Sequence, residues 1–237
     1  MITLVGVGHV FDIGAAIRRT IVGLKPAVVG VELDPARFAA LRAPEANPPA
    51  LSVTGVLAYV QRRIAREYGT QVGAEMMAAA EAARDVGALL AFLDLDSRAV
   101  LARLMRAMTL GEKARFVVSV IAGLFLRRST VERELERFEE DESAFLQELA
   151  KDLPSVKRVL IDERNSHMAM AVRTLEARHG SVVAVVGEGH LEGLRALLAD
   201  RSPDVVRLRE LRHPSSANSR VIPVSSKDEV MSARDNS

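Results

Sequence analysis

The sequence predicts an α/β fold with a largely parallel central sheet flanked by helices. Short runs rich in β-branched apolar residues alternate along the chain with longer segments whose apolar residues recur every three or four positions. The short runs show little polar alternation, which is typical of strands covered on both faces. The segment between residues 96 and 175 has no strand pattern, so we expect a helical insertion between the third and fourth strands.

Strand character is found in the runs 2–7, 28–33, 88–93 and 182–186, and in 205–211, which resembles a half-exposed edge strand. Helical spacing covers the segments 13–24, 35–41, 50–68, 74–86 and 191–198. Right-handed connections would place these helices on both faces of the sheet.

The insertion, at about residues 97–175, contains its own helix-start signals. Thr109 to Glu112 and Ser129 to Glu132 fit the capping-box pattern, which satisfies free amides at a helix start. Pro154 suits the first turn of another helix. We therefore expect one α/β domain over residues 1–212, with three or four inserted helices, followed by a disordered polar tail over residues 213–237.

The composition excludes several classes of function. The formal net charge is +1, with acids and bases interleaved, so the sequence has no basic field for nucleic acid. Cysteine is absent, which leaves histidines and carboxylates as metal ligands. The N-terminus has no basic leader, and the apolar run 116–126 is shorter than the roughly 20 residues that span a bilayer. We expect a cytoplasmic chain without a transmembrane segment.

Ionisable residues follow each of the first four predicted strands. In chain order they are His9, then Glu32 and Asp34, then Asp94 and Asp96, and finally Glu188 and His190. The carboxyl ends of parallel strands meet at one edge of the sheet, where ligands bind. The sequence therefore predicts that these side chains converge on one site.

Two of these strands run into Gly-x-Gly-His turns, which end at His9 and His190. With Glu32 they would make a site of two histidines and one carboxylate that suits zinc, manganese or iron. We expect the two turns to form opposite walls of one crevice, with Glu32 between them. The alternative is that the glycines only make tight turns and each histidine packs locally, but two such turns favour a functional site.

Some of the carboxylates have a structural interpretation. Asp34 is expected to cap the helix that follows, because Pro35 suits its first position. Arg37, one turn into that helix, either anchors a substrate carboxylate or pairs with Asp34, and both interpretations stay open. Asp96 or Ser97 is expected to cap the next predicted helix, which leaves Asp94 with a weaker case for a role in the site.

Glu163 falls on a helical stripe that is predicted to face inward, with Val156, Val159, Leu160 and Met170. A carboxylate on such a face must be paired or functional. His167 lies four residues later, so Glu163 and His167 form a rival metal site. Arg164 places a guanidinium nearby, whereas we assign no role to His179 or His213.

The motifs, taken together, resemble the TraB/PrgY pheromone-shutdown family over roughly residues 1–212. They are GxGH near the N-terminus, VELDxxR at 31–37, GxE at 73–75, ERNxxM at 163–168 and VGEGHLEG at 186–193. That family is related to the Tiki proteases and, more distantly, to erythromycin-esterase-like and ChaN-like proteins. Leu95 and Val100 depart from the family pattern, which has a basic residue and a threonine at these places.

The resemblance implies a metal-dependent hydrolase of the peptidase type. It implies His9, Glu32 and His190 as metal-site residues, with Glu75 and Glu163 as further candidates. Many prokaryotic members carry membrane helices after this domain, so the chain is either a soluble member or a separated domain.

The leading hypothesis is a peptidase in which metal-activated water attacks a peptide or small-molecule substrate, with Glu32, Glu163 or Glu188 as general base. Arg37 and Arg164 complete the expected catalytic set. Two alternatives stay open: a regulatory protein that binds a peptide or metal without turnover, and a metal-free hydrolase with a histidine base. The acidic segment 132–148 is either a solvated helix face, a homodimer surface or a lid.

Overall fold

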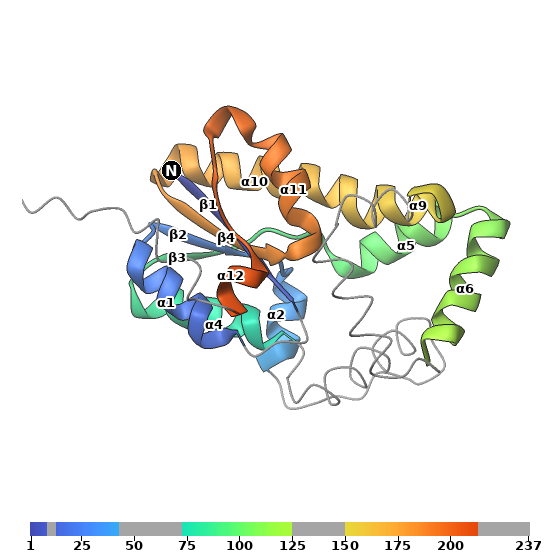
Figure 1. The fold of residues 1–237 in the computed structure, drawn as a ribbon, viewed down its shortest axis with the longest axis horizontal. Coiled ribbons are helices and arrows are strands. Elements are labelled where there is room, and N and C mark those ends of the chain that lie inside the picture. The colour runs from blue at the N-terminus through green and yellow to red at the C-terminus, as the bar shows by residue number, and fades with distance from the viewer. Residues whose placement is uncertain (9–12, 43–72, 125–149, 213–237) are drawn as a thin grey trace, which may run out of the picture.

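The computed structural model describes residues 1–8, 13–42, 73–124 and 150–212. Five parallel strands form one sheet in the order β3-β2-β4-β1-β5 (Figure 1). The strands are β1 (Ile2–Val7), β2 (Val28–Val31), β3 (Leu89–Phe92), β4 (Val182–Gly187) and β5 (Asp204–Val206). The predicted α/β class and its parallel sheet are therefore confirmed.

Alternate residues of the strands face two separate apolar cores. On one face, β1 residues such as Val5 pack with α1 (Gly14–Leu24) and α4 (Ala74–Asp85). On the other face, Leu4 and its neighbours pack with α10 (Glu163–His179) and α11 (Glu188–Leu197). Figure 1 shows these two helix layers above and below the sheet. Because both faces are covered, β1 and β4 are continuously apolar rather than alternating.

The two strands that precede the Gly-x-Gly-His turns are direct neighbours. β1 pairs with β4 in a register that sets Val7 opposite Gly187. β4 also pairs with β2, so it lies between β1 and β2. The expectation that Glu32 lies between the two turns is therefore wrong, because β4 with its turn lies between β1 and β2. The chain leaves β1 toward α1 and β4 toward α11, on opposite faces, which is where a binding site opens in such sheets.

The described part of the insertion is helical, as predicted. It contains α5 (Ser97–Ala107), α6 (Leu110–Leu124), the short α9 (Pro154–Lys157) and a π-helical turn (Arg158–Asp162) that leads directly into α10. A small apolar core holds these elements together, and its buried members are Leu104, Met108, Val156 and Val159. The predicted helix over 50–68, the capping box at Ser129 and the tail lie outside the described residues.

Three predicted helix starts are confirmed. The Asp34 carboxylate accepts the amide of Arg37 at 2.8 Å, at the start of α2 (Pro35–Arg42). The Asp96 carboxylate caps α5 by accepting the amide of Ala99 at 2.8 Å. Pro154 begins α9. These signals were legible in the sequence because each involves groups only a few residues apart.

The predicted edge strand 205–211 is wrong beyond Val206. After β5 the chain turns into α12 (Leu208–Arg212), and Leu208 and Leu211 are buried against α1 and β1. The Glu188 carboxylate accepts the amide of Leu208 at 2.9 Å and so satisfies the start of this helix. Spacing of three residues between the two leucines fits a helix, and a distant carboxylate stabilises it.

The predicted inward stripe is confirmed at Val156 and Val159, which are buried, but it is wrong where it continues into α10. Met170 is 68% exposed, whereas Met168, Ala169 and Val172 pack on the sheet. The π-helical turn over Arg158–Asp162 explains the difference, because each of its hydrogen bonds spans an additional residue. The helical phase that begins at Val156 therefore does not carry through to α10.

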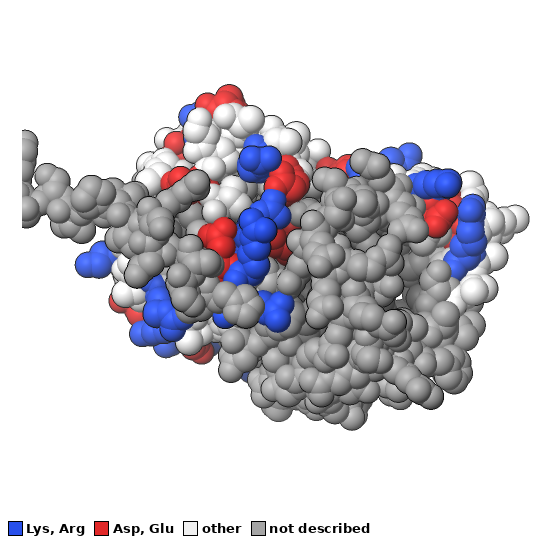
Figure 2. All heavy atoms as spheres, in the orientation of Figure 1, with Lys and Arg blue, Asp and Glu red and all other residues white. Residues whose placement is uncertain are grey.

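Within the described ranges, we find no helix that is long and apolar enough to cross a membrane. On the face shown in Figure 2, basic and acidic side chains of the described residues lie side by side over α11 and α12. Ion pairs between Arg207 and the carboxylates of Glu188 and Glu192 account for part of this pattern.

Glu112 joins the starts of two helices. Its buried carboxylate accepts the amide of Thr109 at 2.8 Å and the amide of Ser155 at 2.8 Å, together with both hydroxyls. The Thr109 hydroxyl accepts the Glu112 amide at 3.2 Å, so the predicted capping box is confirmed. The amides of Thr109 and Ser155 outweigh the effect of burial and lower the pKa of Glu112 from 4.5 to about 2.

We expect Glu112 to make folding stability depend on pH in the acid range. A lowered pKa in the folded state means that its contribution is complete above pH 4.5 and is lost as the pH falls toward 2. Glu112→Gln should lower the thermal unfolding midpoint at pH 6 and lose less than wild type on going to pH 3. Glu81→Gln, on an exposed position of α4, is the matched control. Parallel pH profiles for Glu112→Gln and wild type would contradict this assignment.

Candidate functional site

The carboxylate of Glu32 lies over the end of β4. The backbone amide of Glu32 continues the hydrogen bonding between β2 and β4 by donating to the Val185 carbonyl at 3.0 Å. Its side-chain Oε2 accepts the amide of Gly187, the last residue of β4, at 2.7 Å. The strand pairing therefore places Glu32 beside the second Gly-x-Gly-His turn, as the parallel sheet predicted.

A buried histidine faces this carboxylate. The Nε2 atom of His190, in the first turn of α11, lies 3.3 Å from Oε1 of Glu32. The Nδ1 atom lies 2.7 Å from Oδ1 of Asn165 on α10. An amide oxygen only accepts hydrogen bonds, so Nδ1 carries a hydrogen. In a neutral ring Nε2 then presents a lone pair to a carboxylate oxygen, so a proton or a metal cation is required between them.

A close approach of two helices makes this contact possible. A Cβ atom on Gly193 of α11 would come within 3.0 Å of the amide group of Asn165 on α10, closer than real Cβ atoms approach. Glycine at this position therefore lets the amide reach His190. Asn165 was not among the predicted site residues. Its position three residues before Met168 and four before Ala169, on the same buried face, is the signal that could have identified it.

Arg164 bridges the two carboxylates that follow β2 and β3. Its Nε and Nη2 donate to the two oxygens of Asp94 at 2.9 and 2.7 Å, and Nη2 also contacts Glu32. Its Nη1 donates to the Leu160 carbonyl, in the π-helical turn, at 3.2 Å. Burial lowers the pKa of Arg164, but Asp94 and Glu32 raise it more, so the guanidinium stays charged. The structure therefore places Arg164 beside Glu32, together with Asp94.

Glu32 is held as an anion. Burial raises the pKa of its carboxyl, but His190, Arg164 and the Gly187 amide together outweigh burial and bring the pKa well below the ordinary range. A carboxylate with so low a pKa is a weak base, because it has little tendency to take up a proton near neutral pH. The environment of Glu32 therefore suits cation binding better than proton transfer.

Glu163 and His167 are not part of this cluster. Glu163 is 27% exposed, and both of its oxygens accept hydrogen bonds from Arg103 on α5. His167 is exposed on α10. In the described part of the chain, neither is hydrogen-bonded to Glu32 or His190. The expected inward position of Glu163 is wrong for the reason given for Met170: the π-helical turn brings Arg164 and Asn165 to the site instead.

Glu188 has a structural task. Its Oε2 accepts the Leu208 amide of α12 at 2.9 Å, and its Oε1 accepts from Arg207 at 3.2 Å. Gly6 in β1 leaves space for this carboxylate, since a Cβ atom there would overlap it. Glu188 therefore fixes α12 to the edge of the sheet.

Two of the predicted metal ligands need separate mention. Glu75 is buried in the first turn of α4, on the sheet face opposite α10. Because α4 leads back to β3, its first turn lies toward the carboxyl edge. His9 lies outside the described residues, and Gly8, immediately before it, follows the end of β1. Among the described residues, no group of three His, Cys, Asp or Glu side chains is placed to hold a metal ion.

Together, these features define a doubly wound α/β protein whose candidate site is a buried histidine and carboxylate at the carboxyl edge of a parallel sheet. The chain belongs to the TraB/PrgY/gumN family, whose model matches residues 2–205. An uncharacterized protein of Methanocaldococcus jannaschii is 30% identical over 213 residues, which cover 81% of this chain and 52% of the relative. The chain thus spans about half the length of that relative.

Proposed function

We propose that this chain is a metal-dependent hydrolase that cleaves peptides, with His190 and Glu32 as ligands of a divalent cation and His9 as a further ligand. One observation carries the proposal: Nε2 of His190 and Oε1 of Glu32 face each other at 3.3 Å in a buried place, while Asn165 holds Nδ1. This arrangement needs a positive species between the two atoms, and a metal ion meets that need.

The distance fits a metal ion. Two ligand atoms that each lie about 2.0–2.2 Å from the same ion, at a tetrahedral or octahedral angle, are roughly 2.8–3.6 Å apart. Asn165 orients the His190 imidazole by binding Nδ1, the ring nitrogen that does not face Glu32. The outer partners of metal-binding histidines act in the same way. Nitrogen and carboxylate donors without thiolates suit zinc, manganese or iron.

Each residue of the cluster has a task in this proposal. Asn165 and Gly193 set the orientation of His190, and Arg164 and the Gly187 amide fix the two oxygens of Glu32. A bound divalent ion supplies Lewis-acid chemistry, which polarises a substrate carbonyl and makes water more acidic. Glu75 stays a candidate for a further ligand, and we assign the general base to none of these residues.

A protein that binds a peptide or metal without turnover is the second candidate. The observation that favours it concerns two of the three predicted bases. Glu163 forms an ion pair with Arg103, and Glu188 binds Arg207 and the amide of Leu208. The third, Glu32, has a strongly lowered pKa. In this proposal the site holds a cation, and none of these three carboxylates serves as the proton acceptor.

Metal analysis after reconstitution tests the proposal. We expect wild type to retain about one equivalent of zinc, manganese or iron after gel filtration, and His190→Ala and Glu32→Gln to lose it. Asn165→Ala should weaken metal binding by about 10- to 100-fold, because the outer partner of the histidine is removed. His167→Ala and Glu163→Gln are the controls, and both should retain the metal. Wild type without metal, or metal that survives His190→Ala, would contradict the proposed site.

Peptide hydrolysis then separates the candidate functions. Cleavage of a peptide library that requires metal and stops with a chelator supports the metallopeptidase. Metal binding without cleavage supports the sequestering protein. Cleavage that persists in the chelator and is lost in His190→Ala supports a metal-free hydrolase with a histidine base.

A further inference from the structure

We propose that Arg37 anchors the C-terminal carboxylate of a peptide bound at the carboxyl edge of the sheet, so that free-acid peptides are the ligand class of this site. The inference rests on the proposed function, because it takes the cluster of His190 and Glu32 as the place where the peptide binds.

The guanidinium of Arg37 has N–H groups that are available for a further hydrogen-bond acceptor. It is 40% exposed, and its Nη1 lies 3.7 Å from Oδ2 of Asp94, beyond hydrogen-bond distance. Among the described residues, the only ion pair of this guanidinium is with Asp94, and no hydrogen bond from it is found. The Asp94 carboxylate already accepts two hydrogen bonds from Arg164 and one from the Leu95 amide at 2.8 Å. Asp94 thus leaves most of the Arg37 donors to another acceptor.

Asp34 does not take these donors either. Its Oδ1 accepts the backbone amide of Arg37, and its Oδ2 accepts the backbone amide of Ser97 at 3.2 Å. Of the two interpretations of Arg37 that the sequence left open, pairing of its side chain with Asp34 is therefore wrong. Asp34 instead fixes the first turn of α2 to the start of α5, which holds the backbone of Arg37 in a defined position.

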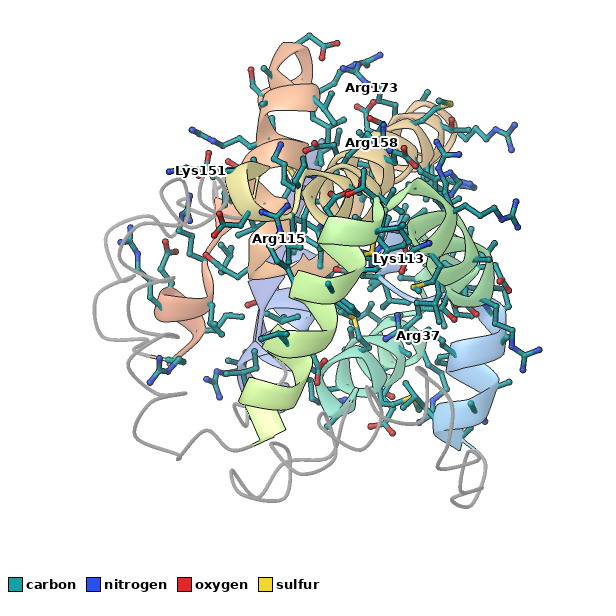
Figure 3. All side chains as sticks on the ribbon, turned by 90° about the vertical axis from the view of Figure 1, so that its right-hand side faces the viewer. Arg37, Lys113, Arg115, Lys151, Arg158 and Arg173 are labelled. Atoms are coloured by element: carbon teal, nitrogen blue, oxygen red, sulfur yellow. The ribbon has the colours of Figure 1, made fainter. Side chains whose placement is uncertain are left out.

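Arg37 lies close to Glu32, one of the two metal ligands in the proposed function. Asp94 and Glu32 share the guanidinium of Arg164, so Arg37 lies beside the carboxylate next to Glu32. Figure 3 labels Arg37 on the inner side of α2. A guanidinium presents parallel N–H groups that match the two oxygens of a carboxylate, and one guanidinium balances one negative charge. A peptide whose last carboxylate binds here would extend from Arg37 toward His190.

The test uses a mixed tripeptide library that is made once with free C-terminal carboxylates and once as C-terminal amides. Each library is dialysed to equilibrium against the metal-free full chain, and the retained peptides are measured by mass spectrometry. We expect wild type to retain free acids about tenfold more strongly than amides, since a charge-assisted pair at a half-exposed site contributes roughly one factor of ten. Arg37→Gln should lose this preference by weakening the retention of acids alone. Arg42→Gln removes a charge from the same helix, where Arg42 lies over the Phe38 ring, and should keep the preference.

Three results would overturn the inference: equal retention of acids and amides by wild type, no retention of either, or a preference that survives Arg37→Gln. Binding is measured without metal or turnover, so the outcome is independent of the proposed hydrolysis. If acids are preferred through Arg37 but the metal-loaded chain cleaves nothing, the ligand class stands and the proposed hydrolase fails. If acids and amides are cleaved equally well, the hydrolase stands and the role of Arg37 fails.

Discussion

Replacing Arg164 by methionine is expected to lower the free energy of unfolding by about 3–5 kcal/mol, because it leaves buried carboxylates without their countercharge. Arg164 is 14% exposed, and its guanidinium is the shared partner of Glu32 and Asp94, which are both buried. Methionine keeps much of the length of the side chain but supplies no donor. Urea unfolding followed by circular dichroism measures the loss.

A second variant separates lost charge from lost packing. In the Arg164→Met background, Asp94→Asn removes one of the two carboxylate charges that lost the guanidinium, and it should recover part of the stability. Arg103→Met is the matched control. It removes an exposed arginine of α5 that pairs with Glu163, the neighbour of Arg164 on α10, and exposed ion pairs contribute little to stability. If Arg164→Met proves no more destabilising than Arg103→Met, the buried network does not have the energetic role that we assign to it.

Replacing Gly6 by alanine is expected to destabilise the fold by about 3 kcal/mol, at the upper end of the usual cost of overpacking. A Cβ atom on Gly6 would overlap the Glu188 carboxylate and a methyl group of Leu191. β1 lies between β4 and β5, so the strand cannot move aside without disturbing two ladders. Displacing Glu188 also removes the acceptor for the Leu208 amide at the start of α12.

The matched control is Gly23→Ala in α1. A Cβ atom there would meet nothing within 4 Å. Alanine within a helix is more stable than glycine by roughly 0.5–1 kcal/mol, so this variant should be stabilised. Replacement of glycine by alanine is thus predicted to lower stability at position 6 and to raise it at position 23. Thermal unfolding of both variants measures it, and equal effects would show that the crowding at Gly6 is relieved by local adjustment.

Local signals predicted a good part of the candidate site. Glu32 and His190 come together because parallel strands end at one edge, and Asp34 caps α2 because the acceptor lies three residues before the amide that it binds. The sequence did not predict the contact between Asn165 and His190, which depends on how closely two helices approach at Gly193.

The helical phase at Glu163 shows why another part failed. Apolar spacing assumes a constant 3.6 residues per turn, and this assumption predicted Glu163 on the inner face. The π-helical turn over Arg158–Asp162 changes the phase, so Arg164 and Asn165 face the site while Glu163 pairs with Arg103. A single irregular turn therefore exchanged the roles of neighbouring residues.

The sequence by itself determined the α/β class, the four longer strands, the helical character of the described part of the insertion and the capping of α2, α5 and α6. These features follow from hydrophobic period and capping, which act over a few residues. Only the tertiary structure decided that β4 lies between β1 and β2, that Glu188 holds α12, and that Asn165 orients His190 toward Glu32. These features depend on which distant segments pack together and on the need of each buried polar group for a partner. No short stretch of the chain shows which distant residue will be that partner.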